Sequence, residues 1–328
     1  MRAGRLARLV AAGTALALGV AGCGLGTSGG YVPTGSLSGS LKSVKNLDGL
    51  TIGIGSKSFQ EQLILGKIAA ILMQSAGAHV EDLTNMPGSD TSRQAMLGGQ
   101  IQMAWEYTGT AWISYLGHDT GIPDKRQQYE AVREEDEQKH QLIWLQPAPM
   151  NNSYGFAVTR KNSEDLSLTK LSQVSSVPAD KRTFCIESEF ANRNDGFEPM
   201  LKHYGVPLGS GVARDNIRTL DTGAVYAATN NGDCLFGEIF TTDGRIKSLD
   251  LVVLEDDKHY FPAYNVAPVV AKKVLDKYPQ LRDLLQPVSD KLTDEVLIDL
   301  NAQVDVDGRE PADVAMDWLV KEGFVSRA

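Results

Sequence analysis

Between residues 50 and 110, the chain alternates short β-branched runs with helical patterns. Residues 50–54 form a β-branched run, and apolar residues then recur every three to four positions until Gly77, which predicts a strand followed by a helix. The same reasoning predicts a strand over 79–84, a helix over 91–97, a strand over 101–106 and a helix that begins at Thr108. This alternation favours a parallel α/β sheet with ligand-binding loops at the carboxyl ends of its strands.

Two interruptions of this pattern, at residues 145–149 and 260–264, suggest two lobes. Between them the alternation repeats, with strands over 154–159 and near Phe184, Cys234 and Leu251; after them we predict a strand over 266–271 and helices over 280–291, 294–304 and 311–322. We therefore expect one α/β lobe (47–150 and 265–328) with a second lobe (151–264) inserted into it. Two-lobed proteins that the chain crosses twice bind ligands in the cleft.

The N-terminal residues 1–22 have the pattern of an export signal. Arginines at positions 2, 5 and 8 precede an apolar run over 9–20, which is shorter than the roughly 20 residues of a membrane-spanning helix. Small residues lead to Cys23, which resembles a bacterial lipobox and predicts a lipid anchor at Cys23; an ordinary signal peptide with an incidental cysteine is the alternative. The Gly- and Ser-rich segment that follows predicts a flexible tether over 23–46.

The composition narrows the function further. The net charge of −9 argues against nucleic acid as a partner, and the acidic run 134–137 is expected to be a solvated helix face. Residues 53–57 lack the spacing of a phosphate loop, and the sequence carries no hydrolase signature. The five histidines are not at metal-ligand spacing. We therefore expect no metal, no cofactor and no catalysis.

Two cysteines besides Cys23 lie in short apolar runs that resemble strands, Cys185 and Cys234. Outside the cytoplasm such a pair can form a disulfide. Two buried free thiols are the alternative, and the sequence leaves both open.

Six motifs occur in order along the chain, at residues 55–62, 106–110, 151–154, 189–196, 242–246 and 261–270. Together they resemble the glycine-betaine/choline/carnitine binding proteins of ABC importers, the family that includes ProX and OsmF. The resemblance runs from about residue 50 to 325. It implies a type II periplasmic-binding-protein fold, with two α/β lobes, two crossings and a ligand cleft between the lobes.

The resemblance also implies a box of aromatic rings for a quaternary-ammonium group, made by Tyr107, Tyr154, Phe240 and Tyr264. Ring faces suit a trimethylammonium group, which carries a positive charge but no N–H to donate. Taken one at a time, aromatic residues at such places are more often packing residues. Phe240 stands where most relatives carry tyrosine, so this position keeps the ring and loses the hydroxyl.

For the carboxylate of a ligand such as glycine betaine, the resemblance implies Lys57, Thr110 and Arg193. Without it, Lys57 is an exposed lysine after a strand and Arg193 a residue that caps a local turn. A neutral Thr110 fits zwitterions, whereas an acid there would suit choline. Three further residues are either cleft-lining or local loop residues: Gln62, Asn152 and Asp243.

These observations predict an extracytoplasmic, lipid-anchored monomer that delivers a small quaternary amine to the permease of an ABC importer. One alternative keeps the fold and changes the ligand to another small polar or aromatic solute. A second alternative is an exported enzyme on the same scaffold, for which Glu106 and Asp243 are the nearest acid–base candidates.

Overall fold

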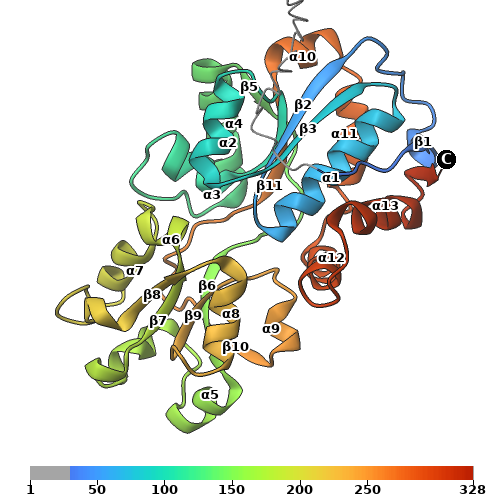
Figure 1. Ribbon diagram of the computed structural model, residues 1–328. Helices are drawn as coiled ribbons and strands as arrows, with labels where there is room; N and C mark the ends of the chain where they lie inside the picture. Colours follow the sequence, from blue (N-terminus) through green and yellow to red (C-terminus); the bar gives the residue numbers. More distant parts are fainter. Residues whose placement is uncertain (1–29, 328) are drawn as a thin grey trace, which may run out of the picture.

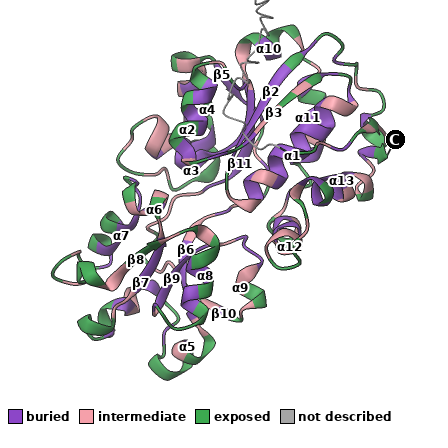
Figure 2. Cartoon of the chain, in the orientation of Figure 1, coloured by how far each residue is buried: buried purple, intermediate pink, exposed green. Residues whose placement is uncertain are grey.

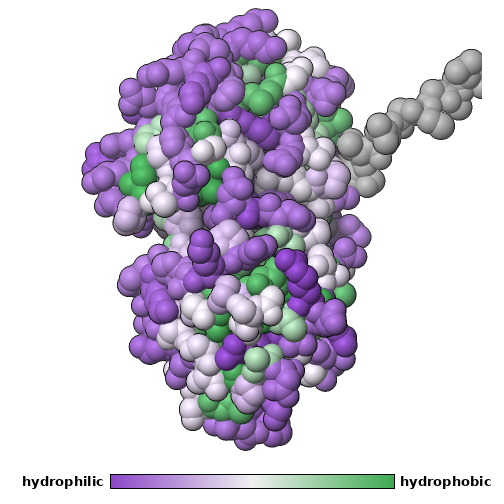
Figure 3. Space-filling view, turned by 90° about the vertical axis from the view of Figure 1, so that its left-hand side faces the viewer, coloured by the Kyte–Doolittle hydropathy of each residue, from purple (hydrophilic) through white to green (hydrophobic). Residues whose placement is uncertain are grey.

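The computed structural model describes residues 30–327, which form two lobes, each built around a five-stranded sheet (Figure 1). The predicted export signal, Cys23 and the first part of the predicted tether lie outside the described residues. In the space-filling view the molecule is elongated and narrows between the lobes, and hydrophilic residues cover most of the visible face (Figure 3). Within residues 30–327, no helix combines the length and the apolar character needed to cross a bilayer.

The sheet of the first lobe has the strand order β3-β2-β4-β11-β5. Its strands are β2 (Thr51–Lys57), β3 (His79–Met86), β4 (Met103–Tyr107), β5 (Leu142–Trp144) and β11 (Val266–Ala271). Strand β2 is parallel to β3 and β4, as expected, but β11 is antiparallel to β4 and β5. The parallel arrangement predicted for the strands before residue 110 is therefore confirmed. The whole sheet is mixed, because β11 returns from the second lobe and enters the sheet from the edge that faces the cleft.

Helices cover both faces of this sheet (Figure 1). They are α1 (Gln60–Ser75), α2 (Gly88–Leu97), α3 (Thr108–Thr110), α4 (Lys125–His140), α10 (Lys272–Lys277), α11 (Leu281–Ser289), α12 (Asp294–Asp305) and α13 (Pro311–Lys321), with a π-helical turn η2 (Ala111–Tyr115) after α3. Helix α1 is buried around most of its circumference, as its nearly continuous apolar sequence requires. Figure 2 shows buried residues concentrated in the sheets and in the helix faces that cover them.

The described part of the predicted tether is folded, so the prediction of a flexible segment up to residue 46 is wrong. Strand β1 (Gly35–Leu37) pairs antiparallel with the C-terminal strand β12 (Val325–Arg327), and a 3₁₀ turn η1 (Gly39–Leu41) follows. Leu41 and Leu47 are fully buried. The Gly- and Ser-rich composition hid Leu41, whose burial offsets the entropy of ordering the segment.

The sheet of the second lobe has the order β10-β6-β9-β7-β8. Its strands are β6 (Tyr154–Thr159), β7 (Phe184–Glu187), β8 (Ile217–Leu220), β9 (Phe236–Phe240) and β10 (Leu251–Leu254). Strand β7 is parallel to β8 and β9, whereas β6 is antiparallel to β9 and β10. Its helices are α5 (Arg160–Leu166), α6 (Ser188–Asn192), α7 (Phe197–His203), α8 (Thr222–Asn230) and α9 (Arg245–Ser248), with 3₁₀ turns η3 (Leu171–Ser176), η4 (Ala179–Lys181) and η5 (Arg214–Asn216).

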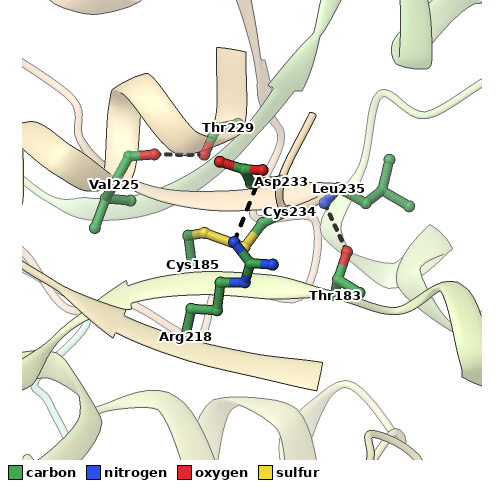
Figure 4. Close-up of a disulfide and its surroundings, with 8 residues drawn as sticks. All are labelled: Thr183, Cys185, Arg218, Val225, Thr229, Asp233, Cys234 and Leu235. Carbon is green, nitrogen blue, oxygen red and sulfur yellow. Dashed lines mark hydrogen bonds and ion pairs between the residues drawn. A yellow bond between two sulfur atoms is a disulfide. The ribbon is translucent and has the colours of Figure 1, made fainter. Parts of the chain in front are cut away.

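A disulfide joins Cys185 to Cys234 in the second lobe, with an S–S distance of 2.04 Å (Figure 4). Cys185 lies in β7, whereas Cys234 lies just before β9 and not in a strand. Both are buried, and the Arg218–Asp233 ion pair lies beside them (Figure 4). Of the two alternatives that the sequence left open, the structure therefore has the bridge.

The two segments that connect the lobes run side by side. Asn151 and Asn265 form an isolated antiparallel bridge, and the Asn265 side chain donates to the Met150 carbonyl at 2.7 Å. The Asn151 side chain in turn accepts from the backbone N–H of Tyr264 at 2.6 Å. These bonds hold the crossings together at the base of the cleft.

Candidate ligand-binding site

A cavity lies between the two lobes and draws its walls from both of them. The lining residues come from strand ends, from the loops and first helical turns that follow strands, and from the crossings: Lys57, Ser58, Phe59, Gly88, Ser89, Tyr107, Thr110, Asn152, Tyr154, Glu187, Glu189, Thr222, Phe240 and Tyr264.

All four rings of the predicted box line this one cavity. Tyr107 and Phe240 end strands β4 and β9, Tyr154 begins β6, and Tyr264 precedes β11. The Tyr154 ring centroid lies 5.4 Å from that of Phe240 and 5.5 Å from that of Tyr264, with which it makes an edge contact. The folding of two sheets toward each other thus brings together rings that are far apart in the sequence.

Phe59 is a fifth ring in the cavity, which sequence reasoning missed. Its centroid lies 6.1 Å from Tyr107 and 5.2 Å from Phe240, so it connects rings of the two lobes. The sequence did contain an indication of this role: Phe59 lies between β2 and α1, and a residue that follows a strand in this way lies at the carboxyl edge of the sheet, where ligands bind.

Two of the rings are fixed by their hydroxyl groups. The Tyr264 hydroxyl donates to Asp195 Oδ2 at 2.6 Å, and the Tyr107 hydroxyl donates to Glu61 Oε1 at 2.7 Å. Burial, followed by the nearby carboxylates, raises the pKa of both phenols well above its ordinary value. Both phenols therefore stay protonated and keep their ring faces in one orientation.

Lys57 and Thr110 line the cavity, but the Lys57 ammonium already has a buried partner. Its Nζ lies 2.7 Å from Glu106 Oε2, and the Tyr115 hydroxyl donates to the same carboxylate at 3.1 Å. The Nζ also lies 4.8 Å from the centroid of the Tyr107 ring. Glu106, considered above as an acid–base candidate, is thus the counter-ion of Lys57.

Arg193 also has carboxylate partners, and it lines the outer part of the cleft instead of the cavity itself. Asp195 binds its guanidinium through two contacts of 2.7 and 2.8 Å, and Glu189 Oε1 lies 3.3 Å from Nη1. The guanidinium carbon lies 5.2 Å from the Tyr154 centroid and 5.9 Å from that of Tyr264. In this arrangement Arg193 supports two rings of the box.

The three residues predicted either to line the cleft or to serve local loops differ in position. Asn152 lines the cavity. Asp243 lines a smaller adjoining cavity and binds Arg245, whose Nε lies 2.9 Å away. Gln62 is buried and is not among the cavity residues; it accepts from the Lys57 N–H at 3.3 Å and donates to the Trp105 carbonyl at 3.1 Å.

The second lobe contributes acidic groups to the cleft. Glu187 and Glu189 line the cavity, and burial, followed by the charge of Glu189, raises the pKa of Glu187. Glu189 also accepts from the N–H of Ser89 in the first lobe, at 3.1 Å, and from the Ser89 hydroxyl. Within residues 30–327, no cluster of three or more histidine, cysteine or acidic side chains could hold a metal ion. The site thus combines ring faces with negative charge, an arrangement suited to an organic cation.

Comparison with known proteins decides the family. A family model described as the substrate-binding domain of the ABC-type glycine betaine transport system matches residues 50–321. The chain belongs to this family. It is therefore the substrate-binding component of an ABC transporter and not an enzyme.

Curated relatives and solved structures agree with this assignment. The chain is 38% identical over 277 residues to a glycine-betaine-binding protein of Pseudomonas aeruginosa, covering 82% of this chain and 87% of the relative. It is 32% identical to the glycine betaine-binding protein YehZ of Escherichia coli, covering 83% and 91%. A solved structure described as a glycine betaine/carnitine/choline ABC transporter superposes with a TM-score of 0.68 at 26% identity, covering 83% and 98%. The predicted type II periplasmic-binding-protein fold is confirmed.

Proposed function

We propose that this protein is a lipid-anchored extracytoplasmic receptor that captures a small quaternary-ammonium compound, such as glycine betaine, and delivers it to the permease of an ABC importer. The observation that carries the proposal is the cavity between the lobes, which five aromatic rings from both lobes line together. The glycine betaine relatives described above support the same ligand class.

The physical case rests on what a quaternary ammonium lacks. It has no proton to donate, so hydrogen bonds cannot hold it, whereas a ring face offers negative potential and apolar contact together. Each ring contributes roughly 0.5–2 kcal/mol when water is excluded. Five rings therefore supply several of the approximately 8 kcal/mol that micromolar affinity requires.

The ligand's other end would meet Lys57 and Thr110 in the cavity, with Arg193 at its outer edge. Because Glu106 and Asp195 already neutralise the two cations, a ligand carboxylate would share them instead of filling vacant sites. The rings therefore determine whether a ligand binds, and the polar end determines which quaternary amine binds best.

Contacts from both lobes to one ligand would favour the closed arrangement of the lobes. The export pattern and the Cys23 motif support attachment to the outer face of the membrane by lipid. A Cys23→Ser change should move the protein from the membrane fraction to the soluble fraction, which immunoblotting of fractionated cells would detect.

Isothermal titration calorimetry with glycine betaine, choline, carnitine, proline betaine and ectoine tests the ligand class. We expect at least one quaternary amine to bind well below millimolar, and Tyr107→Ala and Tyr264→Ala each to weaken it by about tenfold or more. If no quaternary amine binds below millimolar, the ligand assignment is wrong. In that case the same cavity serves another small solute.

A further inference from the structure

We propose that Glu61 is a positioning residue that couples the aromatic box to closure of the lobes. A single buried carboxylate holds a ring of the box and, at the same time, bonds the second lobe to the first. The proposal gives Tyr107 the role in ligand binding proposed above and adds a coupling that the box alone does not provide.

Glu61 lies in the first turn of α1 and is 2% exposed. Its Oε1 accepts from the Tyr107 hydroxyl at 2.7 Å and from the Asn152 side-chain amide at 3.0 Å. Its Oε2 accepts from the Thr242 hydroxyl at 2.5 Å and from the Asn301 side-chain amide at 3.1 Å. Both oxygens are thus fully engaged.

The four donors come from four separate parts of the molecule. Tyr107 ends a strand of the first lobe, Asn152 lies in the first crossing, Thr242 follows β9 of the second lobe, and Asn301 lies on α12. The Asn301 amide also donates to the Thr242 carbonyl at 2.9 Å, which ties the second lobe to α12. Figure 1 shows α12 extending from the first lobe toward the second.

None of the ion pairs formed among residues 30–327 includes Glu61. A buried carboxylate without a cation is costly, and burial raises its pKa while the four hydrogen bonds lower it. The carboxylate therefore depends on its donors. Separation of the lobes would replace the hydrogen bond from Thr242 to Glu61 by one from water, and closure would restore the bond from Thr242.

The coupling follows from the shared acceptor. The Thr242 hydroxyl of the second lobe and the Tyr107 hydroxyl of the first lobe donate to the two oxygens of one rigid carboxylate, that of Glu61. The Glu61–Thr242 bond that forms on closure therefore fixes the carboxylate that orients the Tyr107 ring. A purely structural Glu61 would affect the folding stability but leave ligand affinity and lobe contact unchanged.

The discriminating variant is Thr242→Val, which keeps the volume of the side chain and removes only its hydroxyl. Thr229→Val is a matched control: Thr229 is equally buried in the second lobe, but its hydroxyl donates to the Val225 carbonyl of its own helix. Glu61→Gln gives a second test. Each carboxylate oxygen of Glu61 now accepts from one hydroxyl and one side-chain amide, and glutamine would place an N–H donor at one of these two positions.

Two measurements on each purified variant decide the proposal: calorimetric affinity for the quaternary amine that wild type binds best, and hydrogen exchange of residues 241–245 and 294–305 without ligand. We expect Thr242→Val and Glu61→Gln to bind about tenfold more weakly and to exchange faster in both segments, with Thr229→Val like wild type in both respects.

Wild-type affinity and wild-type exchange in Thr242→Val would overturn the proposal, as would an equal loss of affinity in Thr229→Val. Failure of wild type to bind any quaternary amine would instead contradict the proposed function. The exchange comparison needs no ligand, so it still shows whether the Glu61–Thr242 contact holds the lobes together.

Discussion

Individual rings of the box are held in place by different interactions. Tyr107 and Tyr264 are anchored through their hydroxyls, whereas Phe240 has no hydroxyl and is held by its contacts with Phe59 and Tyr154. Phe240 is therefore a position of the predicted box where a ring face can be removed without breaking a hydrogen bond of the side chain.

Phe240→Leu should weaken binding of a quaternary amine by about fivefold to tenfold, because the apolar volume is largely kept while the ring's negative face is lost. Phe236→Leu is the control: Phe236 lies on the same strand, is fully buried and stacks on Phe184 at 4.9 Å. Titration calorimetry and thermal melting should show a change of affinity for Phe240→Leu and only a lower Tm for Phe236→Leu. The opposite pattern would remove Phe240 from the box.

Asp305 gives the junction between the lobes a pH dependence. Its side chain is 3% exposed, and burial, followed by the charge of Asp243, raises its pKa to about 7, although Arg245 lies 3.4 Å away. The folded protein holds the Asp305 proton more tightly than the unfolded chain does, because aspartates of an unfolded chain titrate near ~4. The stability that the protonated Asp305 contributes is therefore lost as the pH rises through about 7.

Asp305→Asn should therefore reduce the fall in Tm between pH 4 and pH 7, as measured by thermal melting across this range. Asp299→Asn, on an exposed position of the same helix, should leave that fall as it is in wild type. Identical pH profiles for Asp305→Asn and wild type would show that Asp305 does not titrate as described.

Among the elements, the second lobe is cross-linked by the disulfide between β7 and the segment before β9. The two cysteines are 49 residues apart, and closing a loop of that length in the unfolded chain is worth about 2–4 kcal/mol of stability. The double change Cys185→Ala and Cys234→Ala should lower the free energy of unfolding by that amount in denaturant titrations. Affinity should not change, since neither residue lines the cavity; a large loss of affinity would contradict this account.

The turn after β9 meets α12 of the first lobe at Gly244. A Cβ at this position would lie 2.5 Å from the Cα of Ala302 and 2.6 Å from its Cβ, although the φ of −65° is open to any residue. Gly244→Ala should therefore keep each lobe folded but force the lobes apart.

We expect Gly244→Ala to reduce affinity by about tenfold, because overpacking of a tight contact costs roughly 1–3 kcal/mol. Gly98→Ala, at the end of α2 and outside this contact, should bind as wild type does. Calorimetric titration measures both, and unchanged affinity in Gly244→Ala would show that closure does not require this contact.

Element prediction from the sequence succeeded where the apolar pattern was continuous and failed where it was diluted. Strands β6 and β11 have the predicted bounds, because each is largely buried and paired with a neighbouring strand on both sides. Strand β8 was missed because it is an edge strand without a fully buried residue. Strand β1 was missed because it is three residues long and its pairing partner β12 is distant in sequence.

For the whole molecule, the sequence predicted where the rings would be but not how the charges would pair. Lys57 pairs with Glu106, and Asp136, expected on a solvated helix face, is buried and binds Arg93 at 3.0 Å. These ion-pair partners are brought together by tertiary packing, and neither the spacing of charged residues in the sequence nor the amino-acid composition predicts them. Ring positions were predictable because the motifs shared with the betaine-binding family mark them; their place at strand ends, which lie at one edge of an α/β sheet, agrees with this but did not by itself identify them.

Binding of the cation by the rings is tested directly by comparing a quaternary amine with a ligand of the same shape that has no positive charge. Calorimetric titrations should pair glycine betaine with 3,3-dimethylbutyrate, and choline with 3,3-dimethylbutan-1-ol, in which carbon replaces the ammonium nitrogen. If the rings of the cavity bind the cation, the charged member of at least one pair should bind about tenfold or more tightly than its carbon analogue. Equal affinities within both pairs, or no binding by either charged compound, would contradict binding of a quaternary ammonium by the rings of the cavity.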